Sequence, residues 1–219
     1  MSILIAVSSA SAIPDLPTLK TVVADWLDRD DLDSRIPTYV QMAEAMFNRE
    51  LRTPEMEKST LLSASSENVT LPTDYLAMRS IYVEGSPDRP LRGIAPTAIR
   101  QTFDGSTGTP VAYTLVSGGL RLEPPPADAL QLQLDYFARI EGLTDASPSN
   151  WMLEKHPDAY LYGSLFYAEQ MLDNSTRAAQ WKGLLDEVMG RINRAANNDR
   201  YGAGPLVPNL QTQARRARC

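Results

Sequence analysis

Residues 149–172 read SNWMLEKHPDAYLYGSLFYAEQML, and this stretch decides the fold. Proline lacks an amide hydrogen and clashes with the preceding helical turn, so Pro157 predicts that a new helix begins there. Two adjacent faces of this helix are covered by aromatic, aliphatic and small side chains: Tyr160, Ser164, Tyr167 and Met171 on one, and Leu161, Leu165, Ala168 and Leu172 on the other. Such wide apolar coverage indicates a helix that is buried on several sides or shared between subunits.

Helical periodicity also occurs near the start of the chain. Apolar residues repeat at helical spacing over about residues 18–28 and again as far as Leu51, which predicts two helices joined as an αα-hairpin. Asp33 or Ser34 is placed to cap the second helix, and Pro37 fits its first turn. The predicted inward residues are Leu19, Val22, Val23, Trp26 and Leu27 in the first helix, and Ile36, Val40, Ala43, Phe47 and Leu51 in the second.

Two further helix starts are predicted in the second half of the chain. Ser147-Pro148 has the form of a cap followed by a first-turn proline, so helical structure should resume there. A last helix is expected over about residues 176–198, capped by Asn174 or Ser175. Its predicted inward stripe consists of Trp181, Leu184, Leu185, Val188, Ile192 and Ala195.

Between the helical parts the pattern changes to that of strands. Residues 77–84 are rich in β-forming side chains, and a short strand is expected near Leu91 to Ile94. Residues 96–103 are expected to form one short helix. The sequence VAYTLVSGGLRLEP, residues 111–124, predicts a hairpin about Ser117-Gly118-Gly119. In LQLQLDYFAR, residues 130–139, leucines alternate with polar residues, as in an antiparallel strand with one buried face.

The predicted fold class is therefore α+β: a four-helix core of two N-terminal and two C-terminal helices, with a small inserted antiparallel β-sheet domain and an extended C-terminal tail. The expected boundaries are an N-terminal arm over 1–15, a helical hairpin over 16–58, a β-rich insertion over 59–145, a helical pair over 146–199 and a tail over 200–219. Glycines and prolines interrupt this tail, so it should not form a helix.

Charge and cysteine content exclude several classes of protein. The net charge is −6, and residues 200–219 contain four arginines and no acid, which leaves −10 for residues 1–199. An acidic body argues against binding of duplex DNA. The single cysteine, Cys219, excludes a disulfide framework. The apolar start, ILIAV, is too short for a signal peptide and has no preceding basic residues, and no apolar run approaches the length of a membrane span.

Candidate chemistry is sparse. His156 is the only histidine, and neither a metalloprotease motif nor a nucleophile elbow accompanies it, so local capping or packing is favoured over catalysis. The aspartates of residues 28–33 suggest a calcium loop, but Leu32 takes a ligand position and the required glycine is absent. A solvated acidic turn is the favoured interpretation. We therefore predict no catalytic residue, no cofactor and no metal. Tryptophans and tyrosines at helical spacing favour core packing over a ligand pocket.

Five segments, in order, carry a resemblance to a known family. They are WLDRDDLDSRIPTYVQMAEAMFNRELRT (26–53), NVTLPTDYLAMRSIYVEG (68–85), TGTPVAYTLVSGGLRLEPPP (107–126), LQLDYF (132–137) and LEKHPDAYLYGSLFYAEQML (153–172). Over about residues 18–198 the chain resembles the head-to-tail adaptor (connector) proteins of tailed bacteriophages. The order of helix pair, small sheet and helix pair matches as well.

The resemblance implies a structural virion protein rather than an enzyme. Such adaptors form a ring beneath the portal and join it to the tail or nozzle proteins during tail assembly, and DNA passes through the lumen on ejection without sequence-specific binding. A twelvefold portal implies a ring of twelve copies, located at the head-tail junction and assembled in the cytoplasm of the bacterial host, with no membrane contact. An acidic lumen would repel DNA phosphates.

A ring requires each copy to offer two different surfaces. The candidates are the aromatic-rich helix that begins at Pro157 and the flat side of the sheet formed by residues 130–137. The tail offers a third contact, in which apolar side chains and arginines dock on the portal: Tyr201, Leu206, Val207, Leu210, Arg215, Arg216 and Arg218. The alternative function is a small-ligand-binding or enzymatic α+β domain that uses the aromatic cluster.

Overall fold

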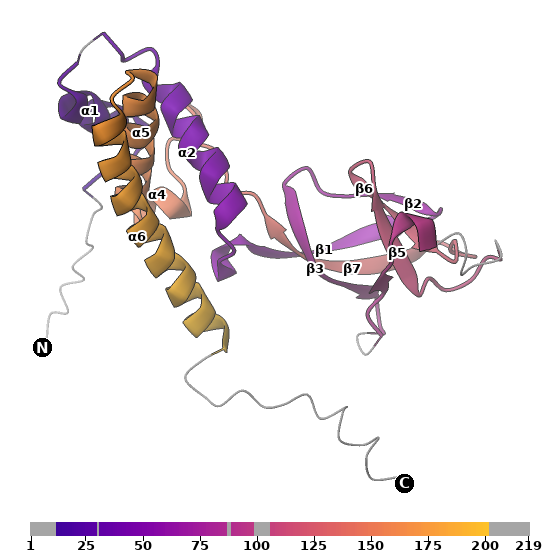
Figure 1. Cartoon of the computed structure of the whole chain (residues 1–219). Coiled ribbons are helices and arrows are strands. Elements are labelled where there is room, and N and C mark those ends of the chain that lie inside the picture. Colours follow the sequence, from indigo (N-terminus) through magenta and orange to yellow (C-terminus); the bar gives the residue numbers. More distant parts are fainter. Residues whose placement is uncertain (1–11, 30, 87–88, 99–105, 202–219) are drawn as a thin grey trace, which may run out of the picture. The chain divides into compact units, whose positions relative to one another are not determined.

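The structure, a computed structural model, describes residues 12–29, 31–86, 89–98 and 106–201 (Figure 1). The chain divides into two compact units. The helical unit comprises Met1–Pro54 and Gly142–Cys219, and the β unit comprises Glu55–Glu141. A β-rich segment is thus inserted between two helical segments, which confirms the predicted α+β class.

The helical unit is built around one central helix. Its elements are α1 (Leu16–Leu27), α2 (Ile36–Glu50), α4 (Trp151–Lys155), α5 (Pro157–Met171) and α6 (Ser175–Tyr201). Helix α5 packs against the other four, and α1 and α2 contact α5 more extensively than they contact each other (Figure 1). Helix α5 begins at Pro157 and buries most of its circumference, as predicted, although Met171 at its end is 62% exposed.

The closest packing in this unit is between α2 and α5. A Cβ atom added at Gly163 would lie 2.8 Å from the Cβ of Ala43, so glycine lets the two helices approach. One turn away the rings of Phe47 and Tyr160 meet edge to face, with centroids 5.2 Å apart. All five residues predicted to face inward on α2 are buried.

Some predicted inward residues are exposed instead. Trp26 is 48% and Leu184 is 41% exposed, and Ala195 also faces solvent, its place taken by buried Ala196. On α1 only a narrow row of side chains, Leu19, Val23 and Leu27, is buried against the core. The predicted stripe was wider and wrongly included Trp26.

Two predicted helix caps are also wrong. Helix α2 has Arg35 at its N-cap without a side-chain cap, because the carbonyl of Leu32 accepts hydrogen bonds from the amides of Arg35 and Ile36 instead. The helix after residue 147 begins only at Trp151, where the Asn150 side chain accepts from the Leu153 amide.

The cap predicted at the start of α6 is confirmed. There the Asn174 side chain accepts from the Arg177 amide at 3.4 Å, and α6 runs over Ser175–Tyr201.

The β unit contains two sheets. Its strands are β1 (Glu57–Ala64), β2 (Asn68–Thr70), β3 (Tyr75–Val83), β4 (Arg92–Gly93), β5 (Ala112–Val116), β6 (Gly119–Glu123) and β7 (Leu130–Ala138), preceded by a 3-10 turn at Pro54–Met56. The first sheet has the order β1-β7-β3 and the second β2-β6-β5-β4. All pairs are antiparallel except β4 with β5, which is parallel.

The core of the β unit is formed by residues of both sheets: Ala64, Val69, Leu71, Ile81, Leu91, Leu120, Leu122, Leu132, Leu134, Tyr136 and Ala138. The alternation predicted for β7 is confirmed, because Leu132, Leu134 and Tyr136 are buried between less buried polar neighbours. The predicted hairpin is confirmed too. Ser117 and Gly118 have φ of 48° and 78°, as in a type I′ turn.

The remaining predictions for this region have a mixed outcome. One sheet was expected and two are present. The division was not predicted, because β1 carries no clear alternation of apolar and polar residues and β2 has only three residues. Residues 96–98 are helical, and the rest of the helix predicted over 96–103 lies outside the described residues. No helix in the described part of the chain is long and apolar enough to cross a membrane.

Candidate functional site

The predicted portal-docking residues fall at the end of the described chain. Tyr201 is the last residue of α6, and the other six lie outside the described residues: Leu206, Val207, Leu210, Arg215, Arg216 and Arg218.

A buried polar network lies at the centre of the helical unit. The Tyr160 hydroxyl donates to Glu44 Oε1 at 3.1 Å and accepts from Asn150 Nδ2 at 2.8 Å. The amide of Leu143 donates to the same Glu44 oxygen at 2.7 Å. Burial raises the pKa of Glu44, although the Leu143 amide and the Tyr160 hydroxyl oppose this effect. Burial and the nearby carboxylate also raise the pKa of Tyr160, so this hydroxyl stays protonated.

This network joins four segments of the helical unit rather than forming a reaction centre. Glu44 comes from α2, Leu143 from the chain that returns from the β unit, Asn150 from the cap of α4, and Tyr160 from α5. Because its polar atoms bond to one another inside the core, its role is to fix the relative positions of these helices.

His156 occupies the junction of two helices. It is both the C-cap of α4 and the residue before α5, and its amide donates to the Met152 carbonyl at 2.8 Å. Its side chain makes no capping hydrogen bond to α5. The local capping role predicted from sequence is therefore carried by its backbone.

The aspartate-rich loop is held by internal pairing. Both oxygens of Asp31 accept from the Arg29 guanidinium, at 2.8 and 2.6 Å, and this hydrogen bonding lowers the pKa of Asp31. Asp28 ends α1 in the left-handed conformation, with φ of 53°. Within the described ranges, no group of three or more acidic, histidine or cysteine side chains is arranged to hold a metal ion.

An aromatic strip, defined here as Trp26, Tyr162 and Trp181, runs across α1, α6 and α5. Trp181 lies between the other two rings, at centroid distances of 5.4 Å from Trp26 and 5.9 Å from Tyr162. Arg177 ties the elements together, because it donates to the Trp26 carbonyl at 3.1 Å and forms an ion pair with buried Glu169 at 2.9 Å. Trp26 is half exposed, so the strip opens to the surface of the helical unit.

The outer face of the β1-β7-β3 sheet is mixed in polarity. At its centre Asp135 accepts hydrogen bonds from the hydroxyls of Ser59 and Ser80. Partial burial raises the pKa of Asp135, but these hydroxyls outweigh it and the pKa lies below its ordinary value. Arg79 lies over the Phe137 ring at 5.7 Å from its centroid. Leu61 on the edge strand is 48% exposed.

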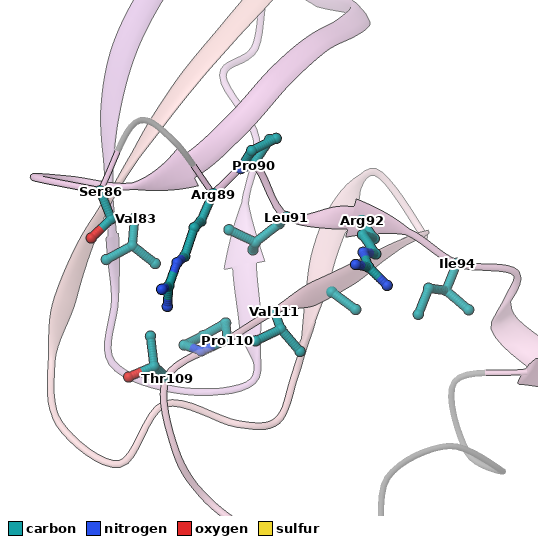
Figure 2. Close-up of a pocket in the computed structure, with 11 residues that line it drawn as sticks. Val83, Ser86, Arg89, Pro90, Leu91, Arg92, Ile94, Thr109, Pro110 and Val111 are labelled. Carbon is teal, nitrogen blue, oxygen red and sulfur yellow. The ribbon is translucent and has the colours of Figure 1, made fainter. Parts of the chain in front are cut away.

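A groove of about 1010 Å³ lies at one edge of the β unit (Figure 2). Its lining residues come from two stretches and the end of β3: Val83, Ser86, Arg89, Pro90, Leu91, Arg92, Ile94, Thr109, Pro110, Val111 and Ala112. This groove was not predicted from the sequence. The available signal was the run RPLR at 89–92, in which two arginines flank a proline and a leucine.

Comparison with known proteins supplies the family. The family model described as SU10 adaptor protein matches residues 14–209, which is nearly the whole chain. No curated protein matches the sequence. The match includes both helical segments and the inserted β unit, in the order that the structure shows. The chain belongs to the SU10 adaptor family of bacteriophage head-to-tail adaptor proteins.

Proposed function

We propose that this protein forms a ring beneath the portal of the phage head, joins the portal to the tail, and leaves a lumen through which DNA passes. The observation that carries this proposal is the match to the adaptor family over residues 14–209. The acidic charge of residues 1–199 supports a passage role, because a surface of the same sign as DNA phosphates does not retain the duplex.

The aromatic strip is our proposed contact between neighbouring copies. A closed ring joins unlike surfaces, so one copy presents the strip and the next presents a different face. Partly exposed tryptophans beside apolar neighbours are typical anchors of protein interfaces. Trp26 is the most exposed member of the strip and is backed by Trp181, so it is positioned to enter a pocket on a neighbour.

The C-terminal tail is our proposed contact with the portal. Its apolar residues, Leu206, Val207 and Leu210, would fill grooves on the portal, while Arg215, Arg216 and Arg218 meet acidic side chains. Each tail contact can be weak, because a ring that carries many tails binds with avidity.

Mass measurement in solution tests the ring. Size-exclusion chromatography with light scattering, on the protein alone and mixed with purified portal, should show a species near twelve times the 24.2 kDa chain. Trp26→Ser should shift the distribution to smaller species, whereas Trp26→Phe should retain the ring. A monomer under both conditions would reject the ring.

The ligand-binding alternative has no arrangement in its favour within the described residues. The tryptophans Trp26 and Trp181 lie in the strip, Tyr160 packs against Phe47 in the core, and the buried polar network bonds to itself.

A further inference from the structure

The groove of the β unit has walls fixed by backbone hydrogen bonds to both sheets. The amide of Leu91 donates to Ile81 of β3 at 2.8 Å, whereas the amides of Arg92 and Ile94 donate to Val111 and Tyr113 at 3.0 and 2.9 Å. The chain from residue 90 to 94 therefore crosses from the edge of one sheet to the edge of the other. The backbone that carries the groove side chains is held in place before any partner arrives, which lowers the entropic cost of binding.

Two arginines of this groove differ from three other cations of the β unit. Lys58, Arg79 and Arg121 each pair with a carboxylate. Arg89 and Arg92 are exposed, and neither has an ion-pair partner among the described residues. Figure 2 shows the Arg89 side chain extending into the space between Val83 and Leu91, with Arg92 farther along the groove.

Apolar side chains line the same groove as the two arginines. Val83, Ile94, Pro110 and Val111 line the groove, and Val111 is 54% exposed. More than half of the Val111 surface is still in contact with water, so covering it would add binding free energy. The groove thus offers cationic groups on a hydrogen-bonded backbone, beside uncovered apolar surface.

We propose that this groove binds an extended segment of another protein in which carboxylates alternate with apolar side chains. The lining residues follow two stretches of chain, 89–92 with Ile94 and 109–112, and an extended peptide can lie along them. Carboxylates on one edge of the peptide meet Arg89 and Arg92, and its apolar side chains cover Val111 and Ile94. That the partner is another protein of the virion rests on the proposed function.

A binding measurement on the full-length protein tests this proposal without needing the ring or the portal. The probe is a fluorescein-labelled peptide of alternating glutamates and valines, followed by fluorescence polarisation. Its matched control is the same peptide with lysines in place of glutamates. A single-stranded DNA oligonucleotide is tested in parallel, because its phosphates could also meet the two arginines.

The acidic peptide should bind, and the lysine peptide should not. Arg89→Glu and Arg92→Glu should each weaken binding about tenfold or more, since each removes a charge-assisted hydrogen bond and adds repulsion. Arg139→Glu makes the same charge change on an exposed residue outside the groove and should leave affinity unchanged. Val111→Ser should weaken binding severalfold, whereas Val116→Ser, at 45% exposure outside the groove, should not.

Three results would overturn the proposal: no binding of the acidic peptide, equal binding of the lysine peptide, or loss of affinity that is as large in Arg139→Glu as in the groove variants. Binding of DNA in place of peptide would assign the arginines to nucleic acid instead. None of these results depends on the oligomeric state, so a failed groove and a failed ring are distinguished by the light-scattering experiment.

Discussion

Tyr160 contributes to stability through its hydroxyl hydrogen bonds and through the packing of its ring, and two substitutions separate these contributions. Tyr160→Phe keeps the ring beside Phe47 but leaves Asn150 and Glu44 each without one hydrogen bond, at a cost of about 1–3 kcal/mol. Tyr160→Ala also leaves a cavity in the core, so its cost should be about 2–5 kcal/mol. Urea unfolding of the two variants measures both terms. Equal stability of wild type and Tyr160→Ala would show that α5 is not central to the core.

Glu44 predicts a specific dependence of stability on pH. Because burial raises its pKa, the folded state holds the proton more tightly than the unfolded state does. The resulting stabilisation is complete below the ordinary value of 4.5 and is lost as the pH rises through the folded-state pKa. Glu44→Gln cannot ionise, so its stability relative to wild type should increase as the pH rises from below 4.5 through the folded-state pKa of Glu44.

The measurement is the difference in unfolding free energy between Glu44→Gln and wild type across that range. Other carboxylates, such as Asp135 with its lowered pKa, act in the opposite direction but are common to both proteins. A difference that stays constant with pH would mean that Glu44 is not perturbed by its burial.

Sequence analysis located Tyr160 on the central helix but not its polar partners. The helical spacing of the aromatic residues is a local pattern, visible within residues 149–172. The hydrogen bond from Tyr160 to Glu44 spans 116 positions along the chain. Nothing near Glu44 marks it as buried, since an acidic residue between two alanines on a helix usually faces solvent.

At the scale of elements, the approach of α2 to α5 depends on one glycine. Gly163→Ala would place a methyl group 2.8 Å from the Cβ of Ala43, which cannot rotate away, so the helices must separate. We expect a loss of about 1–3 kcal/mol despite the better helix propensity of alanine. The double variant Gly163→Ala, Ala43→Gly should recover part of it. Thermal unfolding of the wild type, the single variant and the double variant measures these differences.

Gly183 in α6 is the matched control. Apart from the neighbouring residues and backbone of its own helix, no atom lies within 4 Å of a Cβ added there, and the position is exposed. Gly183→Ala should therefore stabilise the protein by about 0.5–1 kcal/mol through helix propensity alone. If both glycine variants changed the melting temperature in the same direction, close packing at Gly163 would not be the cause.

The elements predicted best are those with a clear hydrophobic pattern and, for helices, a residue that marks the start. Helix α5 has a first-turn proline and a wide apolar surface, and β7 has strict alternation, so both were located correctly. The helix expected from Ser147-Pro148 begins only at Trp151, as α4. Strands β1 and β2 were missed, since most of their residues are polar. The groove was missed as well, because its two walls come from separate stretches that only the fold brings together.

At the scale of the whole molecule, the tail prediction separates folding from assembly. A chain that ends at Asp199 retains nearly all of the described helices and the whole β unit, so it should fold normally. We expect it to lose portal binding, because Leu206, Val207 and Leu210 and the terminal arginines are removed. Circular dichroism checks the fold, and co-sedimentation with portal rings measures the binding.

Salt provides an independent control for the tail. If the arginines contribute, binding of the full-length protein should weaken as ionic strength rises, because added ions screen the charge pairs. Retention of the truncated protein on portal rings at full-length affinity would move the portal contact to the helical body.

The β unit joins the helical unit through two neighbouring strands. The chain enters by β1 and leaves by β7, which pair directly from Glu57 with Phe137 onward. To the folding helical unit, the whole insertion is therefore equivalent to one short loop, whose closure costs little entropy once the β unit has formed. Related phages could exchange the β unit as a cassette, and with it the partner that binds there, while the helical unit retains its own packing. Replacement of residues 57–137 by a short Gly-Ser linker, followed by thermal unfolding, would measure how stable the helical unit is without the β unit.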